Sequence, residues 1–287
     1  MADNSKRLEK ADKLLQKGKA DAALDEYLAI LEDEPKNDKV RQTAADLCLA
    51  VGRNREGSAL LSRLFEQEID SGEVHKGIVT YKKLAKISKP TPLQTFHYGQ
   101  LVEKKDKKEA LEAYQTALEG FEAQRKDKQA VAAAKAIVDL APTPKNLQRA
   151  AEKCAFLGES AAGALFFLQL GLIKEQDAPG SGFEWFEKAY GLDPANLQAV
   201  LLYARGLFAH NALTDCIAVL EPAASGPIST LELRELYARS LMAAKRPAEA
   251  EPFAWELFEK DPNQLADIVS LVGAYLDIGQ AQRALDL

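Results

Sequence analysis

The stretch from Lys10 to Pro35 constrains the fold more strongly than any other part of the chain. Its apolar residues recur at intervals of three and four, which places them along one face of each of two short helices. Gly18 is expected to end the first helix, because glycine adopts a positive φ at the least cost. Pro35 follows the second helix, where a helix can no longer continue. We therefore expect an antiparallel helix pair that buries Ala11, Leu14, Leu15, Ala23, Tyr27 and Ile30.

The same pattern returns at an interval of 34, since Ala45 and Gly52 correspond to Ala11 and Gly18 (45 − 11 and 52 − 18). This interval, with the order small residue, Gly, Ala, aromatic, aliphatic, Pro, resembles the tetratricopeptide repeat (TPR) in a bacterial-type array. The resemblance extends over the whole sequence. It implies an all-α fold: a right-handed α-solenoid of antiparallel helix pairs, a TPR-like superhelix, with about 13 or 14 helices. Each pair would be stabilised mainly by its neighbours.

We expect one continuous domain over residues 1–287, divided in three. Residues 1–36 are the first repeat. Residues 37–194 form three blocks of three helices, in which a long middle helix belongs to two pairs. The prolines that close the first repeat and these blocks are Pro35, Pro90, Pro142 and Pro194, at intervals of 55, 52 and 52 (90 − 35, 142 − 90, 194 − 142). Residues 195–287 hold two regular repeats and an incomplete one, which suggests either a longer protein or an uncapped C-terminus that self-associates.

Composition argues against several classes of function. The formal charge of −6 disfavours nucleic acid, because phosphate binding needs a basic face. No apolar run reaches the roughly 18 residues of a membrane span, and the N-terminus lacks the apolar segment of a signal peptide. The three cysteines, Cys48, Cys154 and Cys216, are sparse and odd in number, which fits core packing in a reducing compartment. We expect a cytoplasmic protein that binds neither nucleic acid nor membrane.

The sequence contains no convincing active site, so we expect no enzyme, no cofactor and no metal. The three histidines, His75, His97 and His210, lie in separate blocks, and none has a metal-ligating partner three or four residues on. The segment Gly180–Gly182 is no phosphate loop, because no strand precedes it and no Walker sequence follows.

The candidate binding residues are two rows that recur from repeat to repeat. Arg205 and Arg239 are separated by 34 (239 − 205), and so are Phe208, Met242 and Leu276 in succession, while Gly273 breaks the arginine row. In TPR arrays the first helices line the concave wall, so the resemblance implies that both rows face a ligand. Guanidinium groups suit carboxylates, which suggests a short acidic and hydrophobic peptide or the C-terminal end of a protein. The alternative is that each arginine pairs with a glutamate such as Glu232 or Glu235, and that the apolar row is packing.

Two further features bear on the partner. TPR domains that bind chaperone C-termini resemble one another in a carboxylate clamp of lysine, asparagine and arginine. Here Asp46 and Glu152 occupy inner positions where that clamp has asparagine, so the clamp is not reproduced and the N-terminal half suits a more basic partner. Trp185 and Trp255 lie in closing helices, where they either anchor a partner or fill the core.

These patterns predict a protein–protein interaction scaffold that binds a peptide or helix of its partner in a concave groove. Two alternatives remain: a regulatory or sensor segment of a larger enzyme or transcription regulator, or a self-associating structural module. The identity of the partner does not follow from the sequence, because one repeat architecture serves many partners.

Overall fold

The structure is a computed structural model that describes residues 2–261 and 265–287. These residues form 17 α-helices and no strand. The all-α solenoid of antiparallel helix pairs is therefore confirmed. The expected number of 13 or 14 helices is wrong, because the described residues form 17. Even the last hairpin is complete enough to have a second helix, of five residues.

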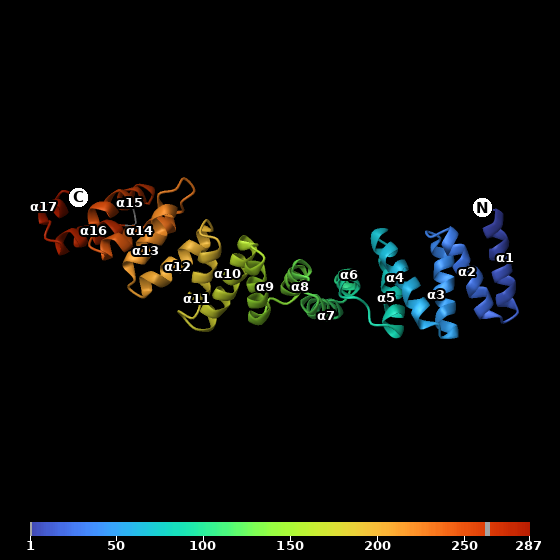
Figure 1. Cartoon of the computed structure of the whole chain (residues 1–287). Coiled ribbons are helices and arrows are strands. Elements are labelled where there is room, and N and C mark those ends of the chain that lie inside the picture. The colour runs from blue at the N-terminus through green and yellow to red at the C-terminus, as the bar shows by residue number, and fades with distance from the viewer. Residues whose placement is uncertain (1, 262–264) are drawn as a thin grey trace. The chain divides into compact units, whose positions relative to one another are not determined.

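The protein divides into two compact units, Met1–Pro142 and Thr143–Leu287. That residues 1–287 form one continuous domain stays a prediction. The first unit contains the helices α1 (Ala2–Gln16), α2 (Ala20–Asp33), α3 (Asp38–Val51), α4 (Asn54–Asp70), α5 (Val74–Ile87), α6 (Pro92–Val102), α7 (Lys107–Ala123) and α8 (Asp127–Leu140). The second contains α9 (Pro144–Phe156), α10 (Ser160–Asp177), α11 (Phe183–Leu192), α12 (Leu197–Ala209), α13 (Leu213–Ala224), α14 (Leu231–Ala243), α15 (Pro247–Lys260), α16 (Ala266–Asp277) and α17 (Ala281–Leu285) (Figure 1).

The first hairpin of unit 1 forms as its spacing predicts. Helices α1 and α2 pack together through a cluster that includes Ala11, Ala23 and Tyr27. Gly18 in the turn has a φ of 71°, and Gly52 caps α3 with a φ of 78°, so both glycines adopt the left-handed conformation that was expected. The apolar spacing and the turn glycines are thus sufficient to place these helices.

The three long helices each pack against both neighbours in sequence. Helices α4 and α7 have 17 residues and α10 has 18, and their first residues lie at intervals of 53 (107 − 54 and 160 − 107). A helix with two neighbours must bury a wide face. In α7 that face consists of Ala110, Ala113, Tyr114, Ala117, Leu118 and Phe121.

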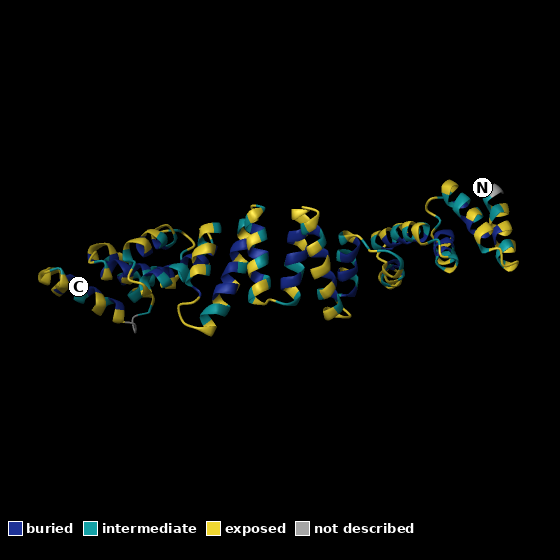
Figure 2. Ribbon diagram, turned by 60° about the horizontal axis from the view of Figure 1, so that its bottom comes forward, coloured by how far each residue is buried: buried dark blue, intermediate teal, exposed yellow. Residues whose placement is uncertain are grey.

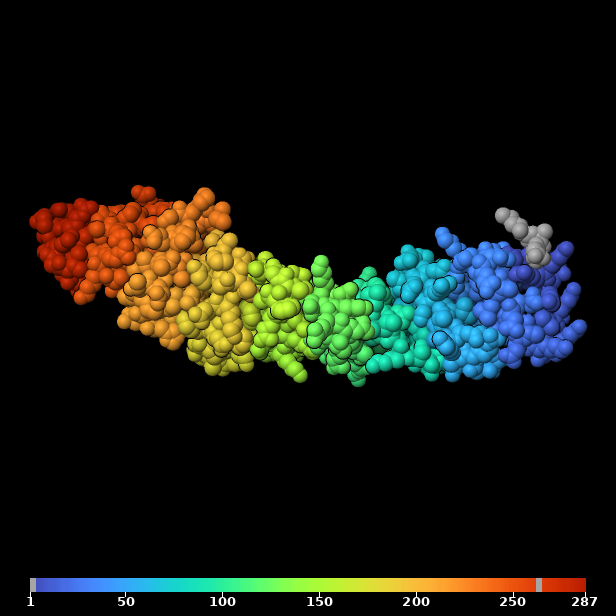
Figure 3. Space-filling view, viewed as in Figure 1, coloured from blue at the N-terminus to red at the C-terminus, as the bar shows by residue number. Residues whose placement is uncertain are grey.

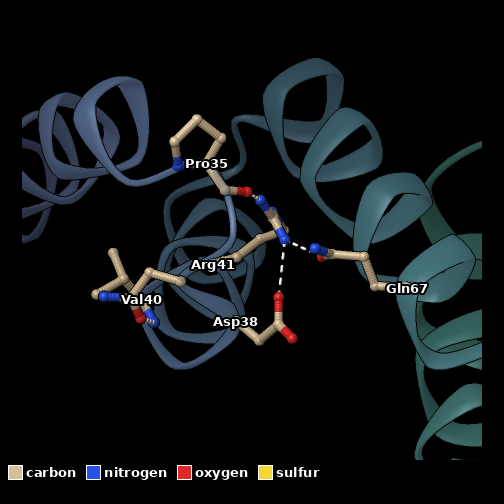
Figure 4. A network of polar contacts seen from close by, with 6 residues as sticks. Pro35, Asp38, Val40, Arg41 and Gln67 are labelled. Carbon is tan, nitrogen blue, oxygen red and sulfur yellow. Dashed lines mark hydrogen bonds and ion pairs between the residues drawn. The ribbon is translucent and has the colours of Figure 1, made fainter. Parts of the chain in front are cut away.

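A buried arginine joins three segments of unit 1. Arg41 on α3 is only 2% exposed, and its guanidinium donates to Asp38, to Gln67 on α4 and to the carbonyl of Pro35 (Figure 4). The Asp38 contact measures 3.0 Å. Since a buried charge is costly unless it is paired and hydrogen-bonded, these three acceptors hold α3, α4 and the α2–α3 turn together.

In unit 2 the first helices of successive hairpins touch one another. Helix α12 contacts α14, and α14 contacts α16, whereas the described residues of α13 and α15 share no contact of comparable extent. The first helices therefore line the inner side of this stack and the second helices its outer side. Buried residues lie between the helices, while exposed ones cover both sides (Figure 2), and side chains fill the spaces between the ribbons (Figure 3).

Among the helices of the described residues, none combines the length and the apolar character that crossing a membrane requires. The long helix α10 has uncharged residues from Ser160 to Ile173 and then carries Lys174, Glu175 and Asp177.

Candidate functional site

The structure places the two predicted arginines on the inner helices of unit 2. Arg205 on α12 has a side chain that is 53% exposed, and its Nη2 lies 3.3 Å from a carboxylate oxygen of Glu232 on α14. The Glu232 side chain is itself 63% exposed. An ion pair between two exposed side chains contributes little free energy, so Arg205 can exchange this partner for another carboxylate.

Arg239 on α14 is held by two carboxylates. Its Nη2 lies 2.7 Å from Glu235, and its Nε donates to Asp267 on α16 across 3.1 Å. The Asp267 side chain is only 7% exposed. Arg239 therefore neutralises a buried charge, although its side chain is still 48% exposed.

Both arginines thus pair with an acidic residue on the next inner helix, Glu232 or Asp267. The alternative weighed from the sequence, that the arginines pair with nearby glutamates, matches the contacts to Glu232 and Glu235. Whether either arginine also contacts a ligand stays a prediction.

The predicted apolar row differs in exposure along its length. Met242 is 8% exposed and belongs to the core of unit 2, and Phe208 is half-buried against the same core. Leu276 is 53% exposed. The difference follows from the packing, because α14 lies against α12 and α16 lies against α14. Only Leu276, and part of Phe208, offer apolar surface to another molecule.

Of the remaining candidates for chemistry, His75 is exposed, His97 and His210 contact neighbouring side chains, and the cysteines are buried. His97 Nδ1 lies 3.0 Å from Gln100 Oε1, and His210 packs against the Phe183 ring. All three cysteines are buried, and burial raises the pKa of the Cys48 and Cys216 thiols, which disfavours the reactive thiolate. In the part of the chain that the structure describes, no group of three or more His, Cys, Asp or Glu residues could hold a metal ion.

The other residues singled out from the sequence have partners within the chain. Asp46 pairs with Lys83 at 2.5 Å, and Glu152 accepts from Gln148 at 2.9 Å. Trp185 is half-buried, with Phe167 stacked on it and the Lys188 ammonium 4.2 Å from its ring centroid. Trp255 is half-buried and packs edge-on against Phe258. These contacts favour a packing role for both tryptophans.

Several polar contacts were missed from the sequence. Tyrosine hydroxyls donate to carboxylates across hairpins, as Tyr27 does to Asp12 at 2.7 Å and Tyr275 to Glu251 at 2.6 Å. Burial, reinforced by the Asp12 carboxylate, raises the pKa of Tyr27 to about 12. The contact of Tyr27 could have been predicted from the sequence, because a tyrosine on a buried helix face needs a hydrogen-bond partner for its hydroxyl. No sequence pattern predicts the hydrogen-bond network of Arg41, because its acceptors come from three separate segments.

These features define a class of protein: an α-solenoid of stacked helical hairpins. Residues 14–78 match the family described as tetratricopeptide repeat, and the stacked hairpins have the fold of TPR solenoids. No curated protein sequence matches it.

Solved structures similar to the chain include three bacterial proteins. A tetratricopeptide repeat protein from Parabacteroides merdae is 16% identical, with 94% of this chain and 98% of that one covered and a TM-score of 0.33. PilF of Pseudomonas aeruginosa is 16% identical, with 74% and 95% covered and a TM-score of 0.33. The apo form of the quorum sensor NprR from B. thuringiensis is 14% identical, with 99% and 84% covered and a TM-score of 0.36.

Proposed function

We propose that unit 2 binds a peptide segment or helix of a protein partner along the inner face formed by α12, α14 and α16. The observation that carries this proposal is the contrast between the two arginines. Arg205 is balanced only by an exposed carboxylate, whereas Arg239 is bound to Glu235 and to the buried Asp267. We assign Arg205 the contact with a carboxylate of the partner, and Arg239 the task of holding the helices that frame it.

Leu276 and the exposed part of Phe208 supply the apolar contacts on the same face. Met242, which is buried between them along the row, supports the backbone of α14 without touching the partner. The partner segment therefore combines at least one carboxylate with bulky apolar side chains, because a guanidinium binds carboxylates and an exposed leucine gains free energy by burial.

The test compares affinity capture by wild-type protein, Arg205→Glu and Arg63→Glu. Arg63 on α4 is also exposed, so its reversal changes the net charge equally in the other unit. We expect proteins that are retained by wild type and Arg63→Glu, and reduced about tenfold in recovery with Arg205→Glu, equivalent to about 1.4 kcal/mol. If all three baits retain the same proteins in the same amounts, Arg205 does not belong to the proposed site.

A second candidate function, self-association, is favoured by the exposed apolar side chains of α16. Val269 and Leu276 are 66% and 53% exposed and lie seven residues apart, on one face of the helix. The equivalent positions on α14 are Glu235 and Met242, which are polar or buried. Light scattering at several concentrations tests this candidate. A dimer that Leu276→Lys dissociates and Asp277→Lys does not would support it, and a wild-type monomer at every concentration would refute it.

A further inference from the structure

A cavity separate from the predicted rows lies among three helices of unit 2. It has a volume of about 380 Å³ and is formed by α11, α12, α13 and the segment that follows α13. Its lining consists wholly of described residues, none of them charged. The side chains that define it are Tyr190, Leu197, Val200, Val219, Pro222 and Ile228.

The cavity exists because α13 ends early. Helices α13 and α15 begin at an interval of 34 (247 − 213), but α13 has 12 residues and α15 has 14. Gly226 and Pro227 follow α13, and a glycine followed by a proline, which has no backbone N–H, disfavours continuation of the helix. The segment 225–230 therefore replaces the last half-turn of the helix, and it carries Ile228 with 72% of its surface exposed.

This cavity and the arginine row use different sides of α12. Val200 lines the cavity and is 1% exposed, whereas Arg205, five residues on, is exposed. Five residues correspond to a rotation of roughly 140° about the helix axis. A ligand in the cavity is therefore independent of one that contacts Arg205.

The lining determines what the cavity can hold. A charged or strongly polar group would lose its hydration there without gaining a partner, so the buried part of a ligand has to be apolar. The volume lies within the range of small-molecule sites and exceeds the space that one aliphatic side chain needs. It suits two neighbouring bulky apolar side chains, the kind of anchor that dominates binding at protein interfaces.

The charge around the cavity determines which residues of a partner can flank the two apolar side chains. The two segments that line it, 190–200 and 219–228, contain Asp193 and Glu221 and no lysine, arginine or histidine. Arg246 lies within electrostatic range of Glu221, but its guanidinium donates to both carboxylate oxygens of Glu249. Glu221 and Glu249 therefore share one guanidinium, and Asp193 adds a further carboxylate to the segments that line the cavity. This excess of negative charge favours a cationic partner.

We propose that this cavity receives two adjacent apolar side chains of a protein partner, from a segment that carries lysine or arginine beside them. The site is separate from the inner face of α12, α14 and α16, and it takes a ligand of opposite charge. It gives unit 2 two contacts of different specificity: a carboxylate at Arg205, and a basic apolar segment at the α11–α13 cavity.

The test selects short random peptides displayed on phage against the full-length protein, and measures the affinity of synthetic copies by fluorescence anisotropy. We expect enriched peptides with paired bulky apolar residues next to lysine or arginine. Ala223→Phe fills the cavity from α13 and weakens their binding about tenfold or more. Ala218→Phe places the same ring on the exposed side of the same helix and leaves the affinity unchanged.

A charge variant keeps the proposal testable if Ala223→Phe disturbs the fold. Asp193→Lys leaves the lining intact and weakens binding about threefold to tenfold, whereas Asp215→Lys, at the other end of α13, does not. Arg205→Glu leaves the affinity of these peptides unchanged, which distinguishes the cavity from the inner face. The proposal is overturned if no peptide is enriched, if the enriched peptides are acidic, or if both Ala223→Phe and Asp193→Lys bind as wild type does.

Discussion

The Nε atom of Arg239 lies 3.1 Å from Oδ1 of Asp267, which joins α14 to α16 through a carboxylate that is almost wholly buried. One repeat earlier, Nη2 of Arg205 reaches Glu232, from α12 to α14, but both of those side chains are exposed. Two arginines at equivalent positions of the repeat therefore have different roles: Arg239 neutralises a buried carboxylate, and Arg205 pairs with an exposed one. The difference lies in the acidic partner, because a carboxylate that has lost its water depends on its counter-ion.

Removing the two arginines separately should therefore have unequal effects. Arg239→Gln leaves the Asp267 carboxylate buried beside a neutral amide and should lower the free energy of unfolding by about 1 to 2 kcal/mol. Arg205→Gln should lower it by less than about 0.5 kcal/mol. Urea titrations followed by circular dichroism measure both values.

The control for this comparison is the double variant Arg239→Gln/Asp267→Asn. It removes both charges, so it should recover much of the loss seen with Arg239→Gln alone. Equal destabilisation by the two single variants would show that the burial of Asp267 does not decide the strength of the pair.

The sequence predicted the helices well because their determinants are local. Apolar spacing, turn glycines and closing prolines act within a few residues, so the hairpin of Ala11 and Tyr27 followed from them directly. The repeat spacing likewise placed Arg205, Arg239 and Leu276 on inner helices. Solvent exposure is not local. Met242 and Leu276 hold the same position in the repeat, yet they are 8% and 53% exposed, because α14 has the inner helix α16 packed against it and α16 has no further inner helix among the described residues.

Other parts of the site depend on departures from the repeat. The α11–α13 cavity arises where α13 is two residues shorter than α15 and a glycine–proline pair redirects the chain. The Gly226–Pro227 pair is visible in the sequence, but the hollow that it leaves depends on Tyr190 and Leu197 from the preceding helices. The buried Asp267 could not be inferred at all, since a carboxylate early in a helix is ordinarily solvated.

Two glycines in unit 2 should respond in opposite directions to alanine. A Cβ at Gly206 on α12 would overlap the Phe183 ring, and that ring is fixed between Tyr203 and His210. Gly206→Ala should therefore cost about 1 to 3 kcal/mol through overpacking. Gly273 on α16 has no atom near the added carbon, so Gly273→Ala should gain up to about 1 kcal/mol from helix propensity.

Thermal unfolding of the two glycine variants beside wild type measures these effects. The chemical change is the same in both, so a shift of the same sign would mean that the space around the glycine is not the deciding factor. The variant Gly206→Ala/Phe183→Leu provides the control, because a smaller side chain at position 183 should relieve part of the overlap.

The buried carboxylate of Glu68 should make unit 1 sensitive to pH. Glu68 on α4 is 6% exposed, and its Oε2 has no hydrogen-bond partner. Burial raises the pKa of Glu68 above its ordinary value, although a hydrogen bond to Thr80 opposes the shift. The folded state therefore binds this proton more tightly than the unfolded state. The associated stability is fully present below the unfolded-state pKa and is lost as the pH rises through the raised pKa.

Glu68→Gln removes the charge and should raise the free energy of unfolding at neutral pH by about 1 kcal/mol. The gain should shrink as the pH falls towards about 4, where wild-type Glu68 is itself protonated. Glu66→Gln, on the exposed side of the same helix, is the matched control and should change little. A gain in the free energy of unfolding for Glu68→Gln that stays constant between neutral and acidic pH would contradict this account.

The turns of the last three hairpins supply a further prediction, because one position in each turn has a positive φ. These residues are Asn211 (58°), Lys245 (60°) and Gly279 (77°), at intervals of 34 (245 − 211 and 279 − 245). Glycine adopts this conformation freely and asparagine tolerates it, but lysine is strained by its Cβ. Lys245→Gly should therefore raise the free energy of unfolding by about 1 kcal/mol.

The neighbouring hairpins provide the comparison for Lys245→Gly. Asn211→Gly should gain less than Lys245→Gly, and Gly279→Lys should lose about 1 kcal/mol, because each replacement acts on the same backbone conformation. Urea unfolding of the three variants gives the order. If Lys245→Gly were destabilising, the side chain of Lys245 would have to contribute more through its contacts than its backbone conformation costs, and the strain would not govern this turn.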